Sequence, residues 1–564
     1  MAKYTTGAAF IDLLNAHGVD KVFINPGGEN ISILADVASA RVQGKDSPQL
    51  VLCLDEAVAA SAAYGNFMVS GKPQMIVVHS EIGILQLGAN LINLQWGRIP
   101  AVILAAYNEA DTHRTTWDGQ PFDQGSIVRN SVKYERKLNG DEDIHEVLTA
   151  AFNVACTEPK GPVYISFPTE YLFREIDKPA ALPTAEAQAL PPVDMQKLGQ
   201  MADILLNAKN PLIVSGYAGR YHENVAALVT LAETLCAQML TGYSWMNFPS
   251  NHPLCVGIEQ IGGSRKMDAG YANADVILAI DYAMPYVASA PPPNPDAKIL
   301  HIDIDPFTQG RPLWWRGADI FMKTDARKAI PALEKLLKDK MTAEQKARLD
   351  KRFSQIAEQN EKIRQQWYTS AQSRAGDESI CPDYLSYCLN QLIDEDTIVI
   401  NHTLSHCASV TEQIVRTKPG TWFGCPSGAI GWAPGAALGA AAAAPEKLVV
   451  AVMTDGGFVW GCPTATLWGA SNYRFPFLSI ICNNKGYGAV RGLQQGHIGM
   501  PYPDEQYIAE SAVDFMPDYA KIAQGAGAYG RTVSKSDDVL PALKEALAAV
   551  RNGQPAVLDV QFAR

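Results

Sequence analysis

The 564-residue chain is 47% apolar and 19% charged, and its length predicts roughly three domains of ordinary size. Its formal net charge of −12 argues against nucleic acid or an anionic membrane as a partner, because either favours a basic face. No apolar run is long enough to span a bilayer and residues 1–10 lack a secretory signal, so we expect a cytoplasmic protein.

The first segment alternates short apolar strands with helical patterns, which is typical of an α/β domain with a parallel sheet. Its expected strands are residues 22–24, 75–78, 101–105 and 161–167. Residues 177–193 are rich in Ala and Pro and have neither strand alternation nor a helical stripe, so they indicate a linker. We therefore place a first domain at residues 1–176.

Two further segments repeat this alternation. The second domain, residues 194–340, has expected strands at 211–214, 276–280 and 299–304. A polar helical stretch, 342–371, leads to a third domain at 375–564 with expected strands at 397–400, 448–453, 477–482 and 556–560. Small residues at 435–444 predict a helix that lies close to a sheet. The fold class predicted is α/β, with three doubly wound parallel-sheet domains.

Two polar motifs follow consecutive apolar strands in the third domain. Residues 454–456 (TDG) end one strand and residues 483–486 (NNKG) end the next. One helix and one strand fit between them, so both motifs would meet at the carboxyl edge of the sheet, where ligands bind in such folds. Carboxylate, amide and carbonyl oxygens suit Mg²⁺. Gly456 and Gly457 would let backbone N–H groups approach a diphosphate closely.

With these motifs the chain resembles the thiamine diphosphate (ThDP)-dependent decarboxylase and acetolactate synthase superfamily, whose signature is a GDG triplet followed at this spacing by an NN pair. The resemblance implies that Asp455, Asn484 and the carbonyl of Gly486 bind Mg²⁺, with Gly456 and Gly457 at the diphosphate. Thr454 replaces the first glycine of the signature. The alternative interpretation is a strand-end turn with a chance Asn-Asn pair.

A second motif lies in the first domain, where residues 52–65 resemble the start of the helix that carries the catalytic glutamate of the family. ThDP reacts after its thiazolium C2 loses a proton, which requires a carboxylic acid at N1′ of the aminopyrimidine. Glu56 takes that position, and Asp55 stands where many members have His. The alternative for Glu56 is a helix N-terminal charge favoured by the dipole.

Two more stretches match the family's cofactor contacts. In residues 427–432 (SGAIGW) the resemblance assigns the carbonyl of Gly428 to the 4′-amino group, and Ile430 to the wedge beneath the cofactor. Residues 401–406 (NHTLSH) resemble the diphosphate loop of benzoylformate decarboxylase. Thr403 and Ser405 are the hydroxyl donors there.

The chain matches the substrate-contacting residues of benzoylformate decarboxylase less completely than the cofactor-binding residues of the family. His79 matches the histidine of benzoylformate decarboxylase that faces the substrate, and it would protonate or orient a carbonyl oxygen; the alternative is a strand-end His bonded to backbone. His113 lies in a polar loop that would cover the same site or simply remain at the surface. Gly28 replaces that enzyme's serine, and residues 286–289 lack its second histidine, which disfavours a straightforward benzoylformate decarboxylase.

The reaction stays open between related chemistries. Val490 stands where pyruvate decarboxylases carry a Glu, so carboligation remains possible. Residues 281–285 lack the Arg of FAD-binding acetolactate synthases, so we expect ThDP and Mg²⁺ but no FAD. The favoured function is a 2-oxo acid decarboxylase with carboligase activity. Alternatives are an acetolactate synthase-like ligase, a diketone-cleaving enzyme and a catalytically silent ThDP-binding paralogue.

The resemblance also predicts the partners. The substrate would be a small 2-oxo acid, aldehyde or ketone. Relatives bind the pyrimidine half of ThDP on the first domain of one subunit and the diphosphate half on the third domain of another. We therefore expect a homodimer or homotetramer with active sites at the subunit interface.

Overall fold

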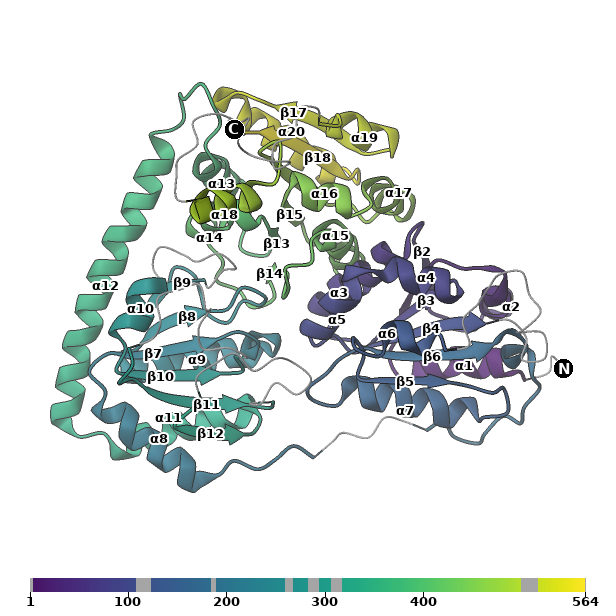
Figure 1. Cartoon of the computed structure of the whole chain (residues 1–564), viewed down its shortest axis with the longest axis horizontal. Helices are drawn as coiled ribbons and strands as arrows, with labels where there is room; N and C mark the ends of the chain where they lie inside the picture. Colours follow the sequence, from purple (N-terminus) through teal and green to yellow (C-terminus); the bar gives the residue numbers. More distant parts are fainter. Residues whose placement is uncertain are drawn as a thin grey trace.

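A computed structural model describes residues 4–107, 123–183, 189–258, 267–282, 294–305, 317–498 and 516–562. Within these ranges the chain forms three six-stranded sheets in which every strand pair is parallel. Helices flank each sheet, as Figure 1 shows. This architecture confirms the predicted fold class.

The first sheet has the strand order β2-β1-β3-β4-β6-β5. Its strands are β1 (Lys21–Ile24), β2 (Gln49–Leu52), β3 (Gln74–Val78), β4 (Ala101–Tyr107), β5 (Tyr134–Lys137) and β6 (Val163–Pro168). The accompanying helices are α1 (Thr6–Ala16), α2 (Ile31–Val42), α3 (Glu56–Ser70), α4 (Ser80–Leu87), α5 (Ala89–Trp96), α6 (Gly125–Val128) and α7 (Ile144–Cys156).

The middle sheet has the order β12-β11-β10-β7-β8-β9. Its strands are β7 (Pro211–Ser215), β8 (Gln238–Thr241), β9 (Cys255–Ile258), β10 (Val276–Ile280), β11 (Lys298–Asp303) and β12 (Ile320–Lys323). Its helices are α8 (Met195–Asn207), α9 (His222–Leu235), α10 (Met267–Asn273) and α11 (Ala326–Lys340). Chain order reverses between β7 and β10, as in doubly wound dinucleotide-binding folds.

The third sheet, β14-β13-β15-β16-β18-β17, repeats the topology of the first. Its strands are β13 (Ile398–His402), β14 (Trp422–Gly424), β15 (Val449–Thr454), β16 (Leu478–Asn483), β17 (Tyr529–Val533) and β18 (Ala556–Gln561). Its helices are α13 (Pro382–Asn390), α14 (Cys407–Gln413), α15 (Trp432–Ala443), α16 (Asp455–Trp460), α17 (Pro463–Tyr473), α18 (Gly488–Ile498), α19 (Tyr519–Gly525) and α20 (Val539–Arg551). In the first and third sheets the order of strand addition reverses between β1 and β3 and between β13 and β15, and ligands bind at the carboxyl ends of the strands at such a point.

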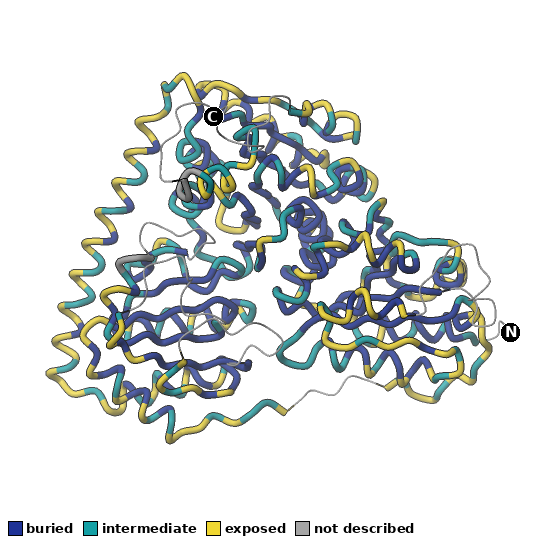
Figure 2. Tube along the Cα trace, in the orientation of Figure 1, coloured by how far each residue is buried: buried dark blue, intermediate teal, exposed yellow. Residues whose placement is uncertain are grey.

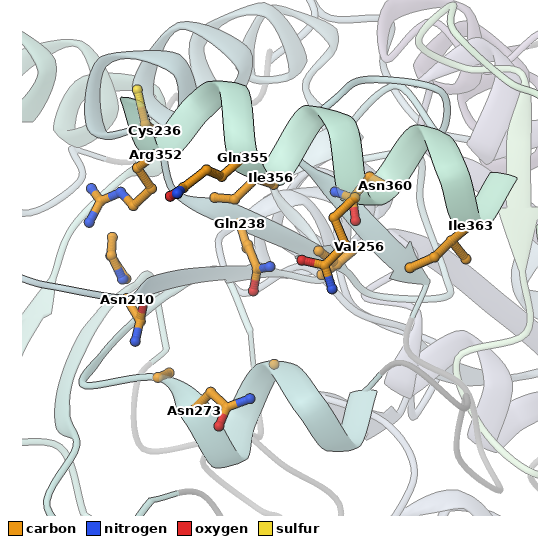
Figure 3. Close-up of a pocket in the computed structure, with 14 residues that line it drawn as sticks. Asn210, Cys236, Gln238, Val256, Asn273, Arg352, Gln355, Ile356, Asn360 and Ile363 are labelled. Carbon is orange, nitrogen blue, oxygen red and sulfur yellow. The ribbon is translucent and has the colours of Figure 1, made fainter. Parts of the chain in front are cut away.

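The long helix α12 (Ala343–Gln372) joins the middle and third domains along one side of the molecule (Figure 1). Arg352 fixes it to the middle domain, because its guanidinium donates to the carbonyls of Ala208 (3.0 Å), Lys209 (2.7 Å) and Leu235 near the ends of α8 and α9. A cavity of about 450 Å³ remains under α12 at the amino edge of the sheet. Figure 3 shows several carboxamide side chains lining it, among them Gln238, Asn273 and Asn360.

Helix α15 makes close contact with α3 of the first domain. A Cβ on Gly65 of α3 would overlap the backbone of Ala436, and a Cβ on Gly439 would overlap that of Ala62. The small residues predicted to pack a helix on a sheet therefore also hold two domains together. Figure 2 shows the inner strands of all three sheets buried, whereas edge strands such as β5 are largely exposed. No described helix combines the length and apolar character that crossing a membrane requires.

Candidate functional site

The two motifs of the third domain meet at the ends of neighbouring strands. Strand β15 pairs with β16 in a register that sets Thr454 beside Cys482. Thr454 caps helix α16 by accepting a hydrogen bond from the N–H of Gly457 (3.0 Å). The departure from the family's glycine thus supplies an N-cap, a role for which threonine is well suited.

Asp455 lies at the first turn of α16 and is 3% exposed. Its carboxylate accepts hydrogen bonds from the N–H groups of Gly456 (2.8 Å) and Gly486 (3.4 Å). Burial raises the pKa of Asp455, although these backbone donors oppose the shift. Among the described residues no cationic side chain forms an ion pair with it, and a buried carboxylate of this kind is suited to a metal ion.

The two asparagines of the NN pair have different surroundings. Asn483 donates to Asp559 (2.8 Å) and accepts from the N–H of Lys485 (3.1 Å), so it shapes the turn. The Oδ1 atom of Asn484 is buried, and no described residue donates to it. Lys485 has a left-handed φ of 56°, and Gly486 has φ 157°. The free Oδ1 of Asn484 and the Asp455 carboxylate, among the described residues, are the kind of oxygen ligands that Mg²⁺ takes. The residues present therefore fit the predicted metal.

A cavity of about 390 Å³ opens beside this cluster, and its exposed lining is mostly apolar. The described lining residues include Ser405, Ile430, Thr454, Asp455, Gly456, Val459, Trp460, Asn484, Gly486, Tyr487, Gly488, Val490, Met516 and Tyr519. A Cβ on Gly488 would lie 2.6 Å from Nδ2 of Asn484 and 3.4 Å from Oγ of Ser405. The structure therefore brings Ser405, Ile430 and the metal motif together.

Three other residues predicted to contact the cofactor, Thr403, Gly457 and Gly428, are not among the described lining residues of this cavity. Thr403 is fully buried and donates its hydroxyl to Oδ1 of Asn401 (2.7 Å), and it is not part of the cavity lining. Gly457 is buried under the Thr454 cap. Gly428 is exposed, and a Cβ there would have no neighbour within 4 Å. The space next to Gly428 is therefore open.

The loop that leads to Ile430 is held by the first domain. Asn93 of α5 accepts a hydrogen bond from Oγ of Ser427 (2.5 Å) and donates to the carbonyl of Ala429 (3.3 Å). Asn93 is completely buried. Sequence reasoning missed this residue, because its partner lies more than three hundred positions away.

Glu56 is the first residue of α3 and is 4% exposed. Asp55 caps the helix by accepting from the N–H of Ala57 (2.8 Å), which explains an aspartate where many relatives have His. On the facing helix α4, a Cβ on Gly83 would lie 2.6 Å from Oε1 of Glu56. The absence of a side chain at position 83 therefore makes room for the Glu56 carboxylate.

His79 follows β3 and is the N-cap residue before α4, on the same edge of the first sheet as Glu56. Its Nδ1 is hydrogen-bonded to the carboxylate of Glu29, a side chain and not the backbone partner of the alternative interpretation. Gly28 is exposed beside this pair. His113 lies outside the described residues.

The two groups of predicted residues are separate within one chain. The described walls of the 390 Å³ cavity all belong to the third domain. Glu56, His79 and Glu29 occupy the matching edge of the first sheet, and Figure 1 shows these two domains side by side. Each domain thus presents one group of the predicted residues at equivalent positions of the same topology.

The structure also adds to the cavity a residue, Tyr519, that the sequence did not single out. Tyr519 lines the cavity, is fully buried and packs edge-on against Phe458. Burial, reinforced by Asp455 and Asp559, raises the pKa of its phenol. Tyr519 follows a stretch without strand or helix motifs, and nothing in its local sequence distinguishes it from a core aromatic residue.

Comparison with known families covers the three domains in order. Residues 4–127 match the family described as "Thiamine pyrophosphate enzyme, N-terminal TPP binding domain". Residues 198–333 match the central domain and residues 405–560 the C-terminal TPP binding domain of the same enzymes.

Similar proteins have several activities. The chain is 27% identical to the acetolactate synthase isozyme 3 large subunit of Escherichia coli, over 96% of this chain and 92% of that one. It is 24% identical to the benzoylformate decarboxylase of Pseudomonas aeruginosa, covering 99% and 98%. A sulfoacetaldehyde acetyltransferase of Castellaniella defragrans is also 24% identical, covering 99% and 93%.

A solved structure confirms the fold. The thiamine diphosphate-dependent 4-hydroxybenzoylformate decarboxylase of Rhodococcus jostii superposes with a TM-score of 0.81 at 22% identity, covering 99% of each chain. At that identity the likeness concerns the fold alone.

Proposed function

Because the chain belongs to the thiamine pyrophosphate enzyme family, we propose that it is a ThDP- and Mg²⁺-dependent 2-oxo acid decarboxylase with carboligase activity. The observation that carries the proposal is the buried Asp455 carboxylate and Oδ1 of Asn484, which accepts from no described residue, both lining a mostly apolar cavity. Bound there, ThDP supplies a nucleophilic carbon and accepts the electrons released when a bond beside a carbonyl breaks.

The protein's own residues would prepare this chemistry. Asp455, Asn484 and the carbonyl of Gly486 would hold Mg²⁺ and through it the diphosphate. Ile430 would support the cofactor from the cavity wall, and Ser405 would donate a hydroxyl to it. Glu56 would exchange a proton with N1′ of the aminopyrimidine, shielded from water by its burial.

The cavity wall favours substrates with an apolar substituent. Val459, Trp460 and Val490 are partly exposed there, at 46%, 59% and 53%, and carry no charge. Without an acidic side chain at Val490, an aldehyde could compete with a proton for the newly formed carbanion. This supports carboligation alongside decarboxylation.

The middle domain is proposed to work without FAD. At the point where its strand order reverses, the N–H groups of Gly216 and Tyr217 bond to the carbonyl of Asp281, and Arg220 pairs with the Asp281 carboxylate at 2.7 Å. Asp303 adds a second fully buried carboxylate at the same edge. Arg98 pairs with Asp303 (3.6 Å), so both arginines at this edge are engaged by carboxylates and neither is left to bind the pyrophosphate of a dinucleotide.

We propose that the complete site forms between two subunits. Large apolar side chains are exposed near both half-sites, including Ile82 and Leu85 on α4, and Trp460 and Leu493 on α16 and α18. Apolar surface beside polar site residues is typical of a protein interface.

Mixed dimers of Glu56→Gln and Asp455→Ala subunits test this arrangement. If the site is shared, each mixed dimer has one doubly altered site and one intact site, and activity returns. If each chain holds its own site, both sites stay damaged and the mixture is inactive. Tandem affinity purification of differently tagged subunits, followed by an activity assay, decides between them.

Carbon dioxide release from a panel of 2-oxo acids with aliphatic and aromatic side chains tests the reaction. We expect release from at least one acid and acyloin products when an aldehyde is added. Release that requires a second 2-oxo acid as acceptor would favour the acetolactate synthase-like alternative. Consumption of a diketone without carbon dioxide would favour the cleavage alternative, and no covalent intermediate by circular dichroism with any substrate would favour the silent paralogue.

A further inference from the structure

An imidazole–carboxylate pair stands at the edge of the first sheet beside Glu56. The N–H of Asn25 donates to the carbonyl of Val77 (3.1 Å), which ties the loop after β1 to the end of β3. Glu29, four residues further along this loop, contacts His79, with Nδ1 of the ring hydrogen-bonded to Oε1 of the carboxylate. An ionised carboxylate accepts but does not donate, so opposite such a group Nδ1 is the ring nitrogen that would carry the proton.

The loop that follows β1 leaves space for the Glu29–His79 pair at Gly27. A Cβ on Gly27 would overlap Nδ1 of His79 and lie 2.5 Å from Oε2 of Glu29. A Cβ on the next residue, Gly28, would meet nothing within 4 Å. The N–H of Gly27 is itself fixed by Oδ1 of the buried Asn30 (3.1 Å). Position 27 therefore needs glycine, because the pair occupies the space of a side chain.

The two side chains of the pair differ in their exposure to solvent. The side chain of Glu29 is 9% exposed, whereas that of His79 is 39% exposed. Within the described residues the ring makes no second hydrogen bond. The carboxylate is thus protected from water, while more than a third of the imidazole side chain stays accessible.

The first turn of α4 contacts both His79 and Glu56. His79 precedes α4, and its carbonyl accepts the N–H of Gly83 (2.5 Å). Position 83 is also where a Cβ would come within 2.6 Å of Glu56. The first turn of α4 therefore links His79 to the carboxylate proposed to act on the cofactor.

We propose that Glu29 is a positioning residue: it holds His79 as the Nδ1–H tautomer and leaves Nε2 to exchange a proton with the substrate's carbonyl oxygen. In this exchange Nε2 gains or returns one proton, Nδ1 keeps its own, and Glu29 stays ionised and balances the imidazolium charge. The inference rests on the proposed function, because it assigns the oxygen to a substrate bound between the half-sites.

The tautomer is measurable on the protein without cofactor, by ¹⁵N NMR after labelling histidine, with His79→Asn to assign the signal. We expect a protonated Nδ1 and an unprotonated Nε2 in neutral wild-type His79. Glu29→Gln and Gly27→Ala should shift the signal toward Nε2–H, whereas Gly28→Ala should leave it unchanged. An unaltered signal in Glu29→Gln overturns the proposal whatever the activity.

Kinetics then test whether the tautomer matters. Glu29→Gln should lower kcat by about 100-fold, with ThDP affinity and KM near wild type. Asp143→Asn alters a similar pair remote from the site, Asp143 with Nδ1 of His145 at 2.8 Å, and should leave kcat unchanged. Wild-type kcat in Glu29→Gln would refute the role. Failure of wild-type protein to take up ThDP would instead refute the proposed function, with the tautomer signal intact.

Discussion

Glu56→Gln should leave ThDP bound but reduce turnover by about 10²- to 10⁴-fold, the range that one proton-transferring group contributes. The amide has nearly the volume of the acid, so the space beside Gly83 and the Asp55 cap of α3 should be retained. It cannot, however, supply or accept a proton at N1′. Measuring kcat, and ThDP binding by fluorescence titration, separates these two effects.

Glu81→Gln is the matched control for this substitution. Glu81 is also a buried carboxylate, 7% exposed, on the neighbouring helix α4, where it accepts from Nε2 of Gln124 (3.3 Å). An amide at position 81 keeps a hydrogen-bonding partner, so kcat should stay close to wild type. Full activity in Glu56→Gln, or an equal loss in both variants, would contradict the catalytic role of Glu56.

Asp455→Ala should abolish Mg²⁺-dependent binding of ThDP. Loss of one partner of a buried charge pair costs roughly 2–5 kcal/mol of binding free energy, and Asp455 is the carboxylate of the cluster at 3% exposure. Isothermal titration with ThDP, at saturating Mg²⁺ and after chelation, gives the affinity. ThDP affinity equal to wild type would remove Asp455 from the ligand set.

The adjacent asparagines give an internal control for this prediction. Asn484→Ala removes the unpartnered oxygen and should weaken ThDP binding with little change in Tm. Asn483→Ala removes the donor to Oδ1 of the buried Asp559, which costs about 1–3 kcal/mol of stability, so its Tm should fall. The same loss of ThDP affinity and Tm in both variants would argue that the NN pair only shapes a turn.

Inner strands were predictable, and edge strands were not. The sequence predicted β1, β3, β4 and β6 in the first sheet and β13, β15, β16 and β18 in the third, because strands covered on both faces read as continuous apolar runs. The six edge strands were missed. In β5, for example, Tyr134–Lys137 is largely exposed and reads as a polar segment. The inner strand β8 was missed as well.

The sequence also predicted that some of the candidate site residues lie close together. Parallel strands end at a common edge, so motifs placed directly after apolar runs were expected to converge, and Asp455, Asn484 and Ser405 do line one cavity. Thr403 was proposed as a donor of the same loop, yet it lies buried against Asn401. Spacing along a loop does not determine which hydroxyl faces outward.

The sequence by itself determined where strands end and which chemical groups follow them, because these are properties of short, contiguous segments. Only the tertiary structure decided which groups meet. It placed Glu29 against His79, Asn93 on the loop before Ile430, and α3 against α15. Such contacts join residues far apart in the chain, and they depend on side-chain packing at distances that no local pattern encodes.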